Sequence, residues 1–183
     1  AGVPMCSHDE ETPKQRRWYH DRGCRVAEFP VNEPTAQEAR ELGDEVVLGA
    51  PNVMKGDSLY GRLSAREAVK DSLCSVLASD YYYPSLLHAP FLIEKLGLAS
   101  LDAAWKLVSL HAARALDLAD RGALEPGLRA DITVLKLQPD GTPVVAATIV
   151  GGTLDYLADE NVLTPAQSLR DDAISRWYRP LGP

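Results

Sequence analysis

The feature that most constrains the fold of this chain is a regular alternation, from the start to about Leu118, of short apolar runs with segments that carry helix start and stop signals. Short apolar runs are typical of buried strands, and their alternation with helices is typical of βα units in a parallel sheet. We therefore predict four parallel strands, at residues 3–7, 24–29, 45–50 and 73–79.

The segments between these runs carry helix signals. Pro13 suits a first helical position and Gly23 suits the position just after a helix. Two further helices are expected to begin at capping boxes, formed by Thr35 with Glu38 and by Ser64 with Glu67. Helices over 85–96 and 100–116 follow the fourth strand.

The pattern changes after Asp120. Two β-runs, 132–138 and 144–150, flank the turn residues 139–141, and a short third strand is expected near Leu154. Four βα strands are half of a closed eight-stranded barrel, which needs about 200 to 250 residues. The predicted fold class is therefore α/β: a partial TIM barrel, about its last half, in residues 1–118, a small β-subdomain element in 119–157, and a polar tail with a helix in 158–183.

Composition narrows the possible partners. A net charge of −7 and a pI near 5.1 argue against a nucleic-acid or anionic-membrane surface. No apolar run approaches the roughly 20 residues that span a bilayer, and no secretory signal is visible. Three scattered cysteines are expected to be buried and reduced, which points to the cytoplasm. The chain opens inside an apolar run without an initiator Met, as if in mid-fold.

Two residues at predicted strand ends could carry metal chemistry. In parallel α/β folds functional groups gather at the carboxyl ends of strands, where His8 and Asp80 stand. His8 could ligate a transition metal, and Asp80 could be both a metal ligand and the base for an attacking water. The alternatives are a surface histidine in a polar turn and an aspartate that caps the next segment. His20, His88 and His111 fall on predicted helices and are interpreted as structural or surface residues.

A long loop, residues 51–62, combines glycines, hydroxyls and cations ahead of a helix. Such a loop can hold a phosphate through its backbone N–H groups and a lysine, although a solvated surface loop fits the same sequence. The residues expected to contact a small phosphorylated substrate lie in this loop and after the fourth strand: Asn52, Lys55, Ser58, Tyr81 and Ser85.

Several runs, in order, resemble a known family: Ser7 to Pro13 (SHDEETP), Glu28 to Pro30, Leu48 to Val53 (LGAPNV), and Ala78 to Tyr82 with Pro84 to Leu87. Together they look like the alpha-D-ribose 1-methylphosphonate 5-triphosphate diphosphatases of the carbon–phosphorus lyase (phosphonate utilisation) pathway, in the amidohydrolase superfamily. The stretch from Arg121 to Asp131 is similar to the return of amidohydrolase chains from barrel to β-subdomain. The resemblance covers roughly Gly2 to Tyr156 and corresponds to a carboxy-terminal portion.

The resemblance implies roles for the two strand-end residues. His8 would be the metal ligand of the sixth barrel strand, and Asp80 the eighth-strand aspartate that binds metal and handles the proton of the nucleophilic water. The implied reaction is hydrolysis of a ribose 5-triphosphate with release of pyrophosphate, aided by one or two divalent ions, most typically zinc. The family's first-strand histidine pair would precede Ala1, and two ligands fall short of the three or four of a zinc site.

Other readings are compatible with the same residues. The 51–62 loop departs from the family's pattern at Asp57, Leu59, Tyr60 and Arg62, so another amidohydrolase that cleaves a C–N bond is an alternative. A truncated, non-catalytic fragment is a second one, and this chain alone is expected to be inactive. Because an incomplete barrel exposes strand edges, we expect a homo-oligomer or a preceding segment to cover them.

Overall fold

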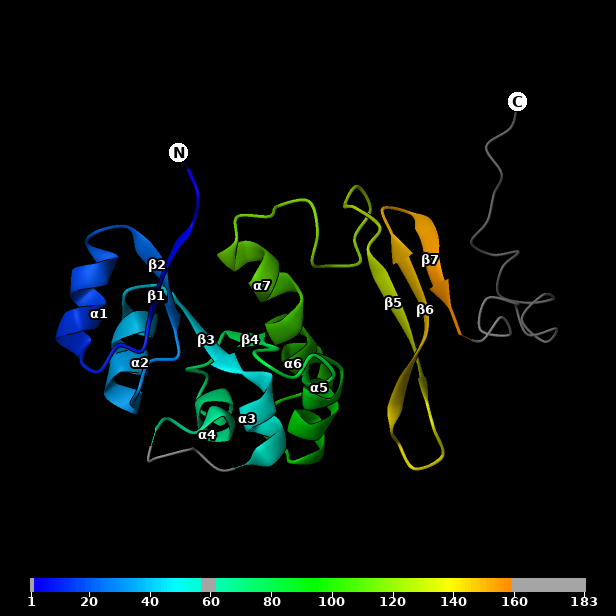
Figure 1. Cartoon of the computed structure of the whole chain (residues 1–183), viewed down its shortest axis with the longest axis horizontal. Coiled ribbons are helices and arrows are strands. Elements are labelled where there is room, and N and C mark those ends of the chain that lie inside the picture. The colour runs from blue at the N-terminus through cyan, green and yellow to red at the C-terminus, as the bar shows by residue number, and fades with distance from the viewer. Residues whose placement is uncertain (1, 57–61, 159–183) are drawn as a thin grey trace. The chain divides into compact units, whose positions relative to one another are not determined.

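The chain divides into two compact units, Ala1–Leu128 and Arg129–Pro183, in a computed structural model that describes residues 2–56 and 62–158 (Figure 1). Residues 119–128, which we grouped with the later strands, lie in the first unit. The helix predicted in the tail falls outside the described residues, as does Ser58.

The first unit is built on a four-stranded sheet. Its strands are β1 (Met5–His8), β2 (Cys24–Glu28), β3 (Glu45–Gly49) and β4 (Val76–Ala78), in the order β1-β2-β3-β4. Every neighbouring pair is parallel. The prediction of four parallel strands is confirmed, and so all four strands end at the same edge of the sheet.

Seven helices connect and cover these strands in the described part of the unit. They are α1 (Pro13–His20), α2 (Glu33–Glu41), α3 (Ala50–Lys55), α4 (Ala65–Lys70), α5 (Ser85–Lys95), α6 (Leu101–Val108) and α7 (Leu110–Ala115). Figure 1 shows α1 and α2 beside each other next to β1 and β2. The helix starts expected at Pro13, Ser64 and Ser100 are confirmed.

Three details of the predicted helices were wrong. Asn32, not Thr35, caps α2: its side-chain oxygen accepts a hydrogen bond from the Thr35 N–H at 3.1 Å, and Pro34 occupies the first turn. The helix expected over 100–116 breaks at Ser109, whose hydroxyl donates to the Trp105 carbonyl at 2.7 Å in place of a backbone N–H. The first half of the predicted 51–62 loop is helix α3.

Both faces of the parallel sheet are covered. Alternate strand residues Ala27, Val46, Leu48 and Leu77 join one core cluster, which includes several small helix residues such as Ala36 and Ala39. The residues between them, Val26, Val47 and Val76, form a second cluster with Ala112 and Ala115 of α7. Burial on two faces explains why these strands read as continuous apolar runs.

The second unit contains a separate antiparallel sheet. Its strands are β5 (Ile132–Leu137), β6 (Pro143–Val150) and β7 (Thr153–Leu157), paired in that order. The turn predicted after β5 is confirmed: the Thr142 N–H donates to the Asp140 carboxylate at 2.9 Å, which lowers the pKa of Asp140. Between β6 and β7, Gly151 and Gly152 adopt positive φ angles that favour glycine.

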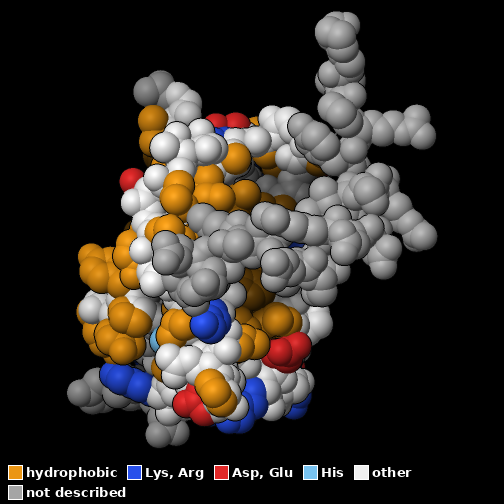
Figure 2. Space-filling view, turned by 90° about the vertical axis from the view of Figure 1, so that its right-hand side faces the viewer, with side chains coloured by type: hydrophobic (Ala, Val, Ile, Leu, Met, Phe, Trp, Pro, Cys, Tyr) orange, Lys and Arg blue, Asp and Glu red, His pale blue; other side chains and the backbone are white. Residues whose placement is uncertain are grey.

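Hydrophobic side chains are also exposed, and orange patches of them lie among charged groups in Figure 2. Val3 and Met5, at the β1 edge, and Leu154, Tyr156 and Leu157 of β7 are all exposed. Exposed apolar groups on strand edges invite pairing with another surface. The expectation that a second copy or another segment covers the β1 edge stays a prediction.

The cysteines differ in exposure. Cys74 is buried, Cys24 is partly buried and Cys6 is exposed, so the expectation of three buried thiols was wrong for Cys6, which lies on an edge strand. Burial raises the pKa of the Cys74 thiol to about 12, and its Sγ donates to the Val76 carbonyl at 3.3 Å. No helix in the described residues is long and apolar enough to cross a membrane.

We predict that N-ethylmaleimide at pH 8 labels Cys6 and leaves Cys74 unmodified in the folded chain. A thiol with a pKa near 12 has only about one part in ten thousand of its reactive thiolate at that pH. Mass spectrometry of peptides before and after denaturation measures the labelling. Modification of Cys74 in the native chain, at the rate of Cys6, would contradict the burial described here.

Candidate active site at the carboxyl ends of the strands

A cavity of about 390 Å³ lies at the carboxyl edge of the parallel sheet. Its volume is within the range of small-ligand pockets. Ten residues line it, from strand ends, the loops after them and helix α3: His8, Asp9, Phe29, Pro30, Leu48, Asn52, Arg62, Leu63, Asp80 and Tyr81. The two predicted metal ligands, His8 and Asp80, therefore face one cavity.

These two residues line one cavity although they follow opposite edge strands of the sheet. His8 ends β1 and Asp80 follows β4, the two outer strands of the order β1-β2-β3-β4. Three strand spacings of about 4.8 Å would hold the ends of a flat sheet roughly 14 Å apart. A curled sheet turns its outer strands toward each other, as the wall of a barrel does.

The backbone at this edge is unusual. Asp9, Phe29 and Asp80 have φ angles of 56°, 54° and 50°, and they are three of the five described non-glycine residues with positive φ. The Asp9 and Phe29 N–H groups each donate to the neighbouring strand, to Glu28 O at 3.0 Å and Val47 O at 2.9 Å. Such conformations are strained for residues other than glycine and gather at functional sites, because the surrounding structure must hold them.

His8 is flanked by carboxylates. Its Nδ1 lies 3.0 Å from Asp9 Oδ2, and its Nε2 lies 4.0 Å from Glu28 Oε2. The Phe29 ring packs against the imidazole, with ring centroids 5.4 Å apart. When Nδ1–H donates to Asp9, the lone pair of Nε2 is available to a metal, which is how a second-shell carboxylate sets the tautomer of a ligand histidine.

Asp80 is one of the residues that line the cavity. No hydrogen bond or ion pair joins it to another residue in the described part of the chain, so the capping role that sequence left open is not seen there. The same part of the chain contains no group of three His, Cys, Asp or Glu side chains that could hold a metal ion. His8 and Asp80 are thus two donors of a site that would need more.

The predicted substrate residues separate into two groups. Asn52 and Tyr81 line the cavity, and Lys55 Nζ donates to the Tyr81 hydroxyl at 2.6 Å. Ser85 stands apart: it is fully buried, and its hydroxyl donates to the Tyr82 carbonyl at 2.6 Å. The start of the 51–62 loop also differs from the expectation of a loop, because residues 50–55 form α3 and the Gly56 N–H donates to Asn52 O at 3.0 Å.

Arg62 and Asp9 are cavity residues to which the sequence reasoning assigned no role of their own, although Asp9 stands beside His8 at the same strand end. Arg62 Nη1 lies 2.7 Å from Asp9 Oδ1, across 53 positions of sequence. The signal that could have found Arg62 is its place just before Ser64, the N-cap that closes the loop. Asp9 adjoins His8, and its role depends on a side-chain direction that sequence does not give.

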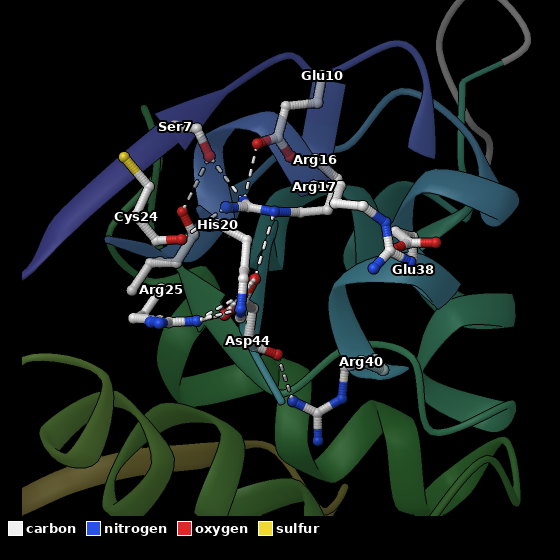
Figure 3. Close-up of polar contacts among 11 residues, drawn as sticks. Ser7, Glu10, Arg16, Arg17, His20, Cys24, Arg25, Glu38, Arg40 and Asp44 are labelled. Atoms are coloured by element: carbon white, nitrogen blue, oxygen red, sulfur yellow. Dashed lines mark hydrogen bonds and ion pairs between the residues drawn. The ribbon is translucent and has the colours of Figure 1, made fainter. Parts of the chain in front are cut away.

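A buried charge network supports the end of β1 (Figure 3). Arg16 of α1 has no exposed side-chain surface; its Nη1 lies 2.8 Å from both Ser7 Oγ and Glu10 Oε1, and its Nη2 donates to Cys24 O at 2.6 Å. Ser7 and Glu10 flank His8 and Asp9 in sequence. One guanidinium therefore holds the chain on both sides of the predicted ligand.

The same network reaches the start of β3. Arg16 Nε lies 3.4 Å from the buried carboxylate of Asp44, which also contacts His20 Nδ1 at 2.9 Å. The Glu10 oxygens and Arg16 Nε make no well-aligned hydrogen bond in the described residues, so their attraction is chiefly that of opposite charges. His20 has the structural role that we expected of it.

Comparison with known proteins bears on this architecture. No protein-family model matches the chain. It is 37% identical over 134 residues to alpha-D-ribose 1-methylphosphonate 5-triphosphate diphosphatase of Escherichia coli K12. That match covers 72% of this chain but only 35% of the relative, in its C-terminal part, so the chain spans about a third of the relative's length.

Solved structures with a similar fold are amidohydrolase-type barrel enzymes. Aspergillus niger ochratoxinase superposes with a TM-score of 0.60 at 19% identity, over 83% of this chain and 41% of that one. E. coli guanine deaminase superposes with a TM-score of 0.54 at 18% identity, over 85% of this chain and 48% of that one. The predicted resemblance and fold class are confirmed: the described chain is an unclosed part of an amidohydrolase-type TIM barrel, with a separate antiparallel sheet.

We predict that Arg16→Met lowers the free energy of unfolding by about 3 to 5 kcal/mol, because it leaves the buried carboxylate of Glu10 without its cation and removes one of the charged partners of the buried Asp44. Arg17→Met, one position along the same helix, is the matched control. Arg17 is largely exposed and pairs with Glu38, and its loss should cost less than about 1 kcal/mol. Urea unfolding followed by circular dichroism measures both, and equal losses would show that the buried network is not what stabilises this end of the sheet.

Proposed function

We propose that the protein containing this chain is a metal-dependent phosphohydrolase that releases pyrophosphate from a ribose 5-triphosphate. The observation that carries the proposal is the cavity that His8 and Asp80 share with Asn52 and Arg62. The 37% identity to the E. coli diphosphatase supports the substrate class. A divalent ion, zinc by the chemistry of an imidazole and carboxylate donor set, is part of the proposal.

The residues present fit part of such a metal site. His8 Nε2 and the Asp80 carboxylate would hold the ion, and the Asp9 contact to His8 Nδ1 orients the imidazole for that role. A bound divalent ion lowers the pKa of its water and offsets phosphate charge. Since a zinc site has three or four protein ligands, the remaining donors would come from outside the described residues.

Asp80 would handle the proton. In the proposed reaction a water oxygen attacks the α-phosphorus, the bond from that phosphorus to the bridging oxygen breaks, and pyrophosphate leaves with the bridging oxygen. The Asp80 carboxylate would accept the proton of the attacking water, and its unpaired state among the described residues suits it to that role. The product retains a 5-phosphate.

Lys55, Arg62 and Asn52 would hold the phosphate chain. Arg62 lines the cavity, and Lys55 Nζ donates to the hydroxyl of Tyr81, which is one of the lining residues. Cations of this kind favour a polyanion over the neutral amide of a C–N substrate. This charge is the reason for preferring phosphoanhydride hydrolysis to the C–N cleavage that also fits the barrel.

We predict that Asp80→Asn in the full-length protein reduces pyrophosphate release by a factor of about 100 to 10,000, because the amide cannot accept the proton. The fold should be retained, since the Asp80 side chain makes no hydrogen bond or ion pair with another residue in the described part of the chain. Asp102→Asn is the control: Asp102 is an exposed aspartate on α6, paired with Lys106, and it does not line the cavity.

Pyrophosphate release from ribose 5-triphosphates and from nucleoside triphosphates is measured in a coupled assay with both variants. Wild-type turnover by Asp80→Asn would remove Asp80 from the reaction. Hydrolysis of amide or amidine substrates without release of pyrophosphate would instead favour a C–N hydrolase.

A further inference from the structure

Arg62, Asp9 and His8 form a continuous chain of contacts along the cavity. Arg62 Nη1 lies 2.7 Å from Asp9 Oδ1, and Asp9 Oδ2 lies 3.0 Å from His8 Nδ1. One carboxylate therefore serves two partners with its two oxygens. All three residues line the same cavity.

The ion pair between Arg62 and Asp9 costs little to break, so Arg62 can leave Asp9 for another anion. The side chains are 51% and 44% exposed, and ion pairs of that exposure contribute only about 0 to 1 kcal/mol. A polyphosphate offers several charged oxygens to the planar guanidinium, and bidentate contacts of this kind are stronger than one contact to a carboxylate. A polyphosphate in this cavity would therefore compete with Asp9 for Arg62.

We propose that Arg62 is a specificity-determining residue that Asp9 holds in the free protein and that turns to the phosphate chain of the substrate when it binds. The inference rests on the proposed function for its substrate class. Lys55, held at the cavity by Tyr81, is the second cation for the same anion. After the exchange, Asp9 keeps its contact to His8, so the anion is recognised without loss of the imidazole's orientation.

This arrangement requires opposite effects from the two partners of the pair. Removing Arg62 takes away a contact to the anion and should weaken binding. Replacing Asp9 with asparagine removes the competitor of the anion and a nearby negative charge, and it should strengthen binding. A merely structural ion pair would weaken binding, or leave it unchanged, when either partner is replaced.

The test is tripolyphosphate binding to the full-length protein by isothermal titration calorimetry in EDTA, which needs neither metal nor turnover. We expect Arg62→Gln to weaken binding about tenfold, the loss of one charge-assisted contact, and Arg62→Lys to retain part of the affinity. Asp9→Asn should tighten binding about two- to fivefold, within the small energy of the pair. In the Arg62→Gln background the gain from Asp9→Asn should be smaller, because the competition for Arg62 is absent there and only the loss of the negative charge remains.

Arg22→Gln is the matched control, because Arg22 is an arginine that stacks on Trp18 and lies outside the cavity. The Arg22→Gln variant should bind tripolyphosphate with the affinity of the unsubstituted protein. Unchanged affinity in Arg62→Gln, weaker binding in Asp9→Asn, or no tripolyphosphate binding at all would overturn the inference. The outcome is separate from that of Asp80→Asn: hydrolysis without these binding changes would leave the proposed function standing and remove the role of Arg62.

Discussion

The buried guanidinium of Arg16 is the contact on which the candidate site most depends. It joins the loop after β1, through Glu10, to the starts of β2 and β3, through Cys24 O and Asp44. A charge with no exposed surface is costly unless it is compensated on several sides. The arrangement that satisfies Arg16 therefore also fixes the positions of Ser7 and Glu10, and with them the course of His8 and Asp9 between them.

Fixing that short segment makes its strained backbone possible. Asp9 keeps a positive φ because its N–H is held by Glu28 O and its neighbour Glu10 is held by Arg16. Phe29, which directly follows the end of β2, is held in the same way: its N–H donates to Val47 O of β3. Each positive φ turns the chain sharply away from the direction of its strand. The residues at these turns line the cavity and do not extend the strands.

Much of this edge could be predicted because strand ends are readable in the sequence. His8 and Asp80 follow apolar runs, and parallel strands end together, so the sequence alone predicts that both lie at one edge of the sheet. The burial of Arg16 could not be predicted in this way. Arg16 stands next to Arg17 on a polar helix, and such a sequence is typical of residues that face solvent. The Arg62–Asp9 contact joins positions 53 residues apart, and local patterns carry no information about such a pair.

The errors at helix ends have one physical origin. Thr35 and Asn32 both offer a capping side chain, and Asn32 prevails because Pro34 suits the first turn of a helix that begins at Glu33. Residues 50–55 turn into helix α3 directly after β3, which carries Asn52 into the cavity lining and brings Lys55 to Tyr81. A helix fixes these two side chains more firmly than a loop would, so under the proposed function the anion would be met by positioned side chains. Beside these fixed groups, the half-exposed pair of Arg62 with Asp9 is the part of the proposed site that can change partners, and it is there that a ligand's charge would be distinguished.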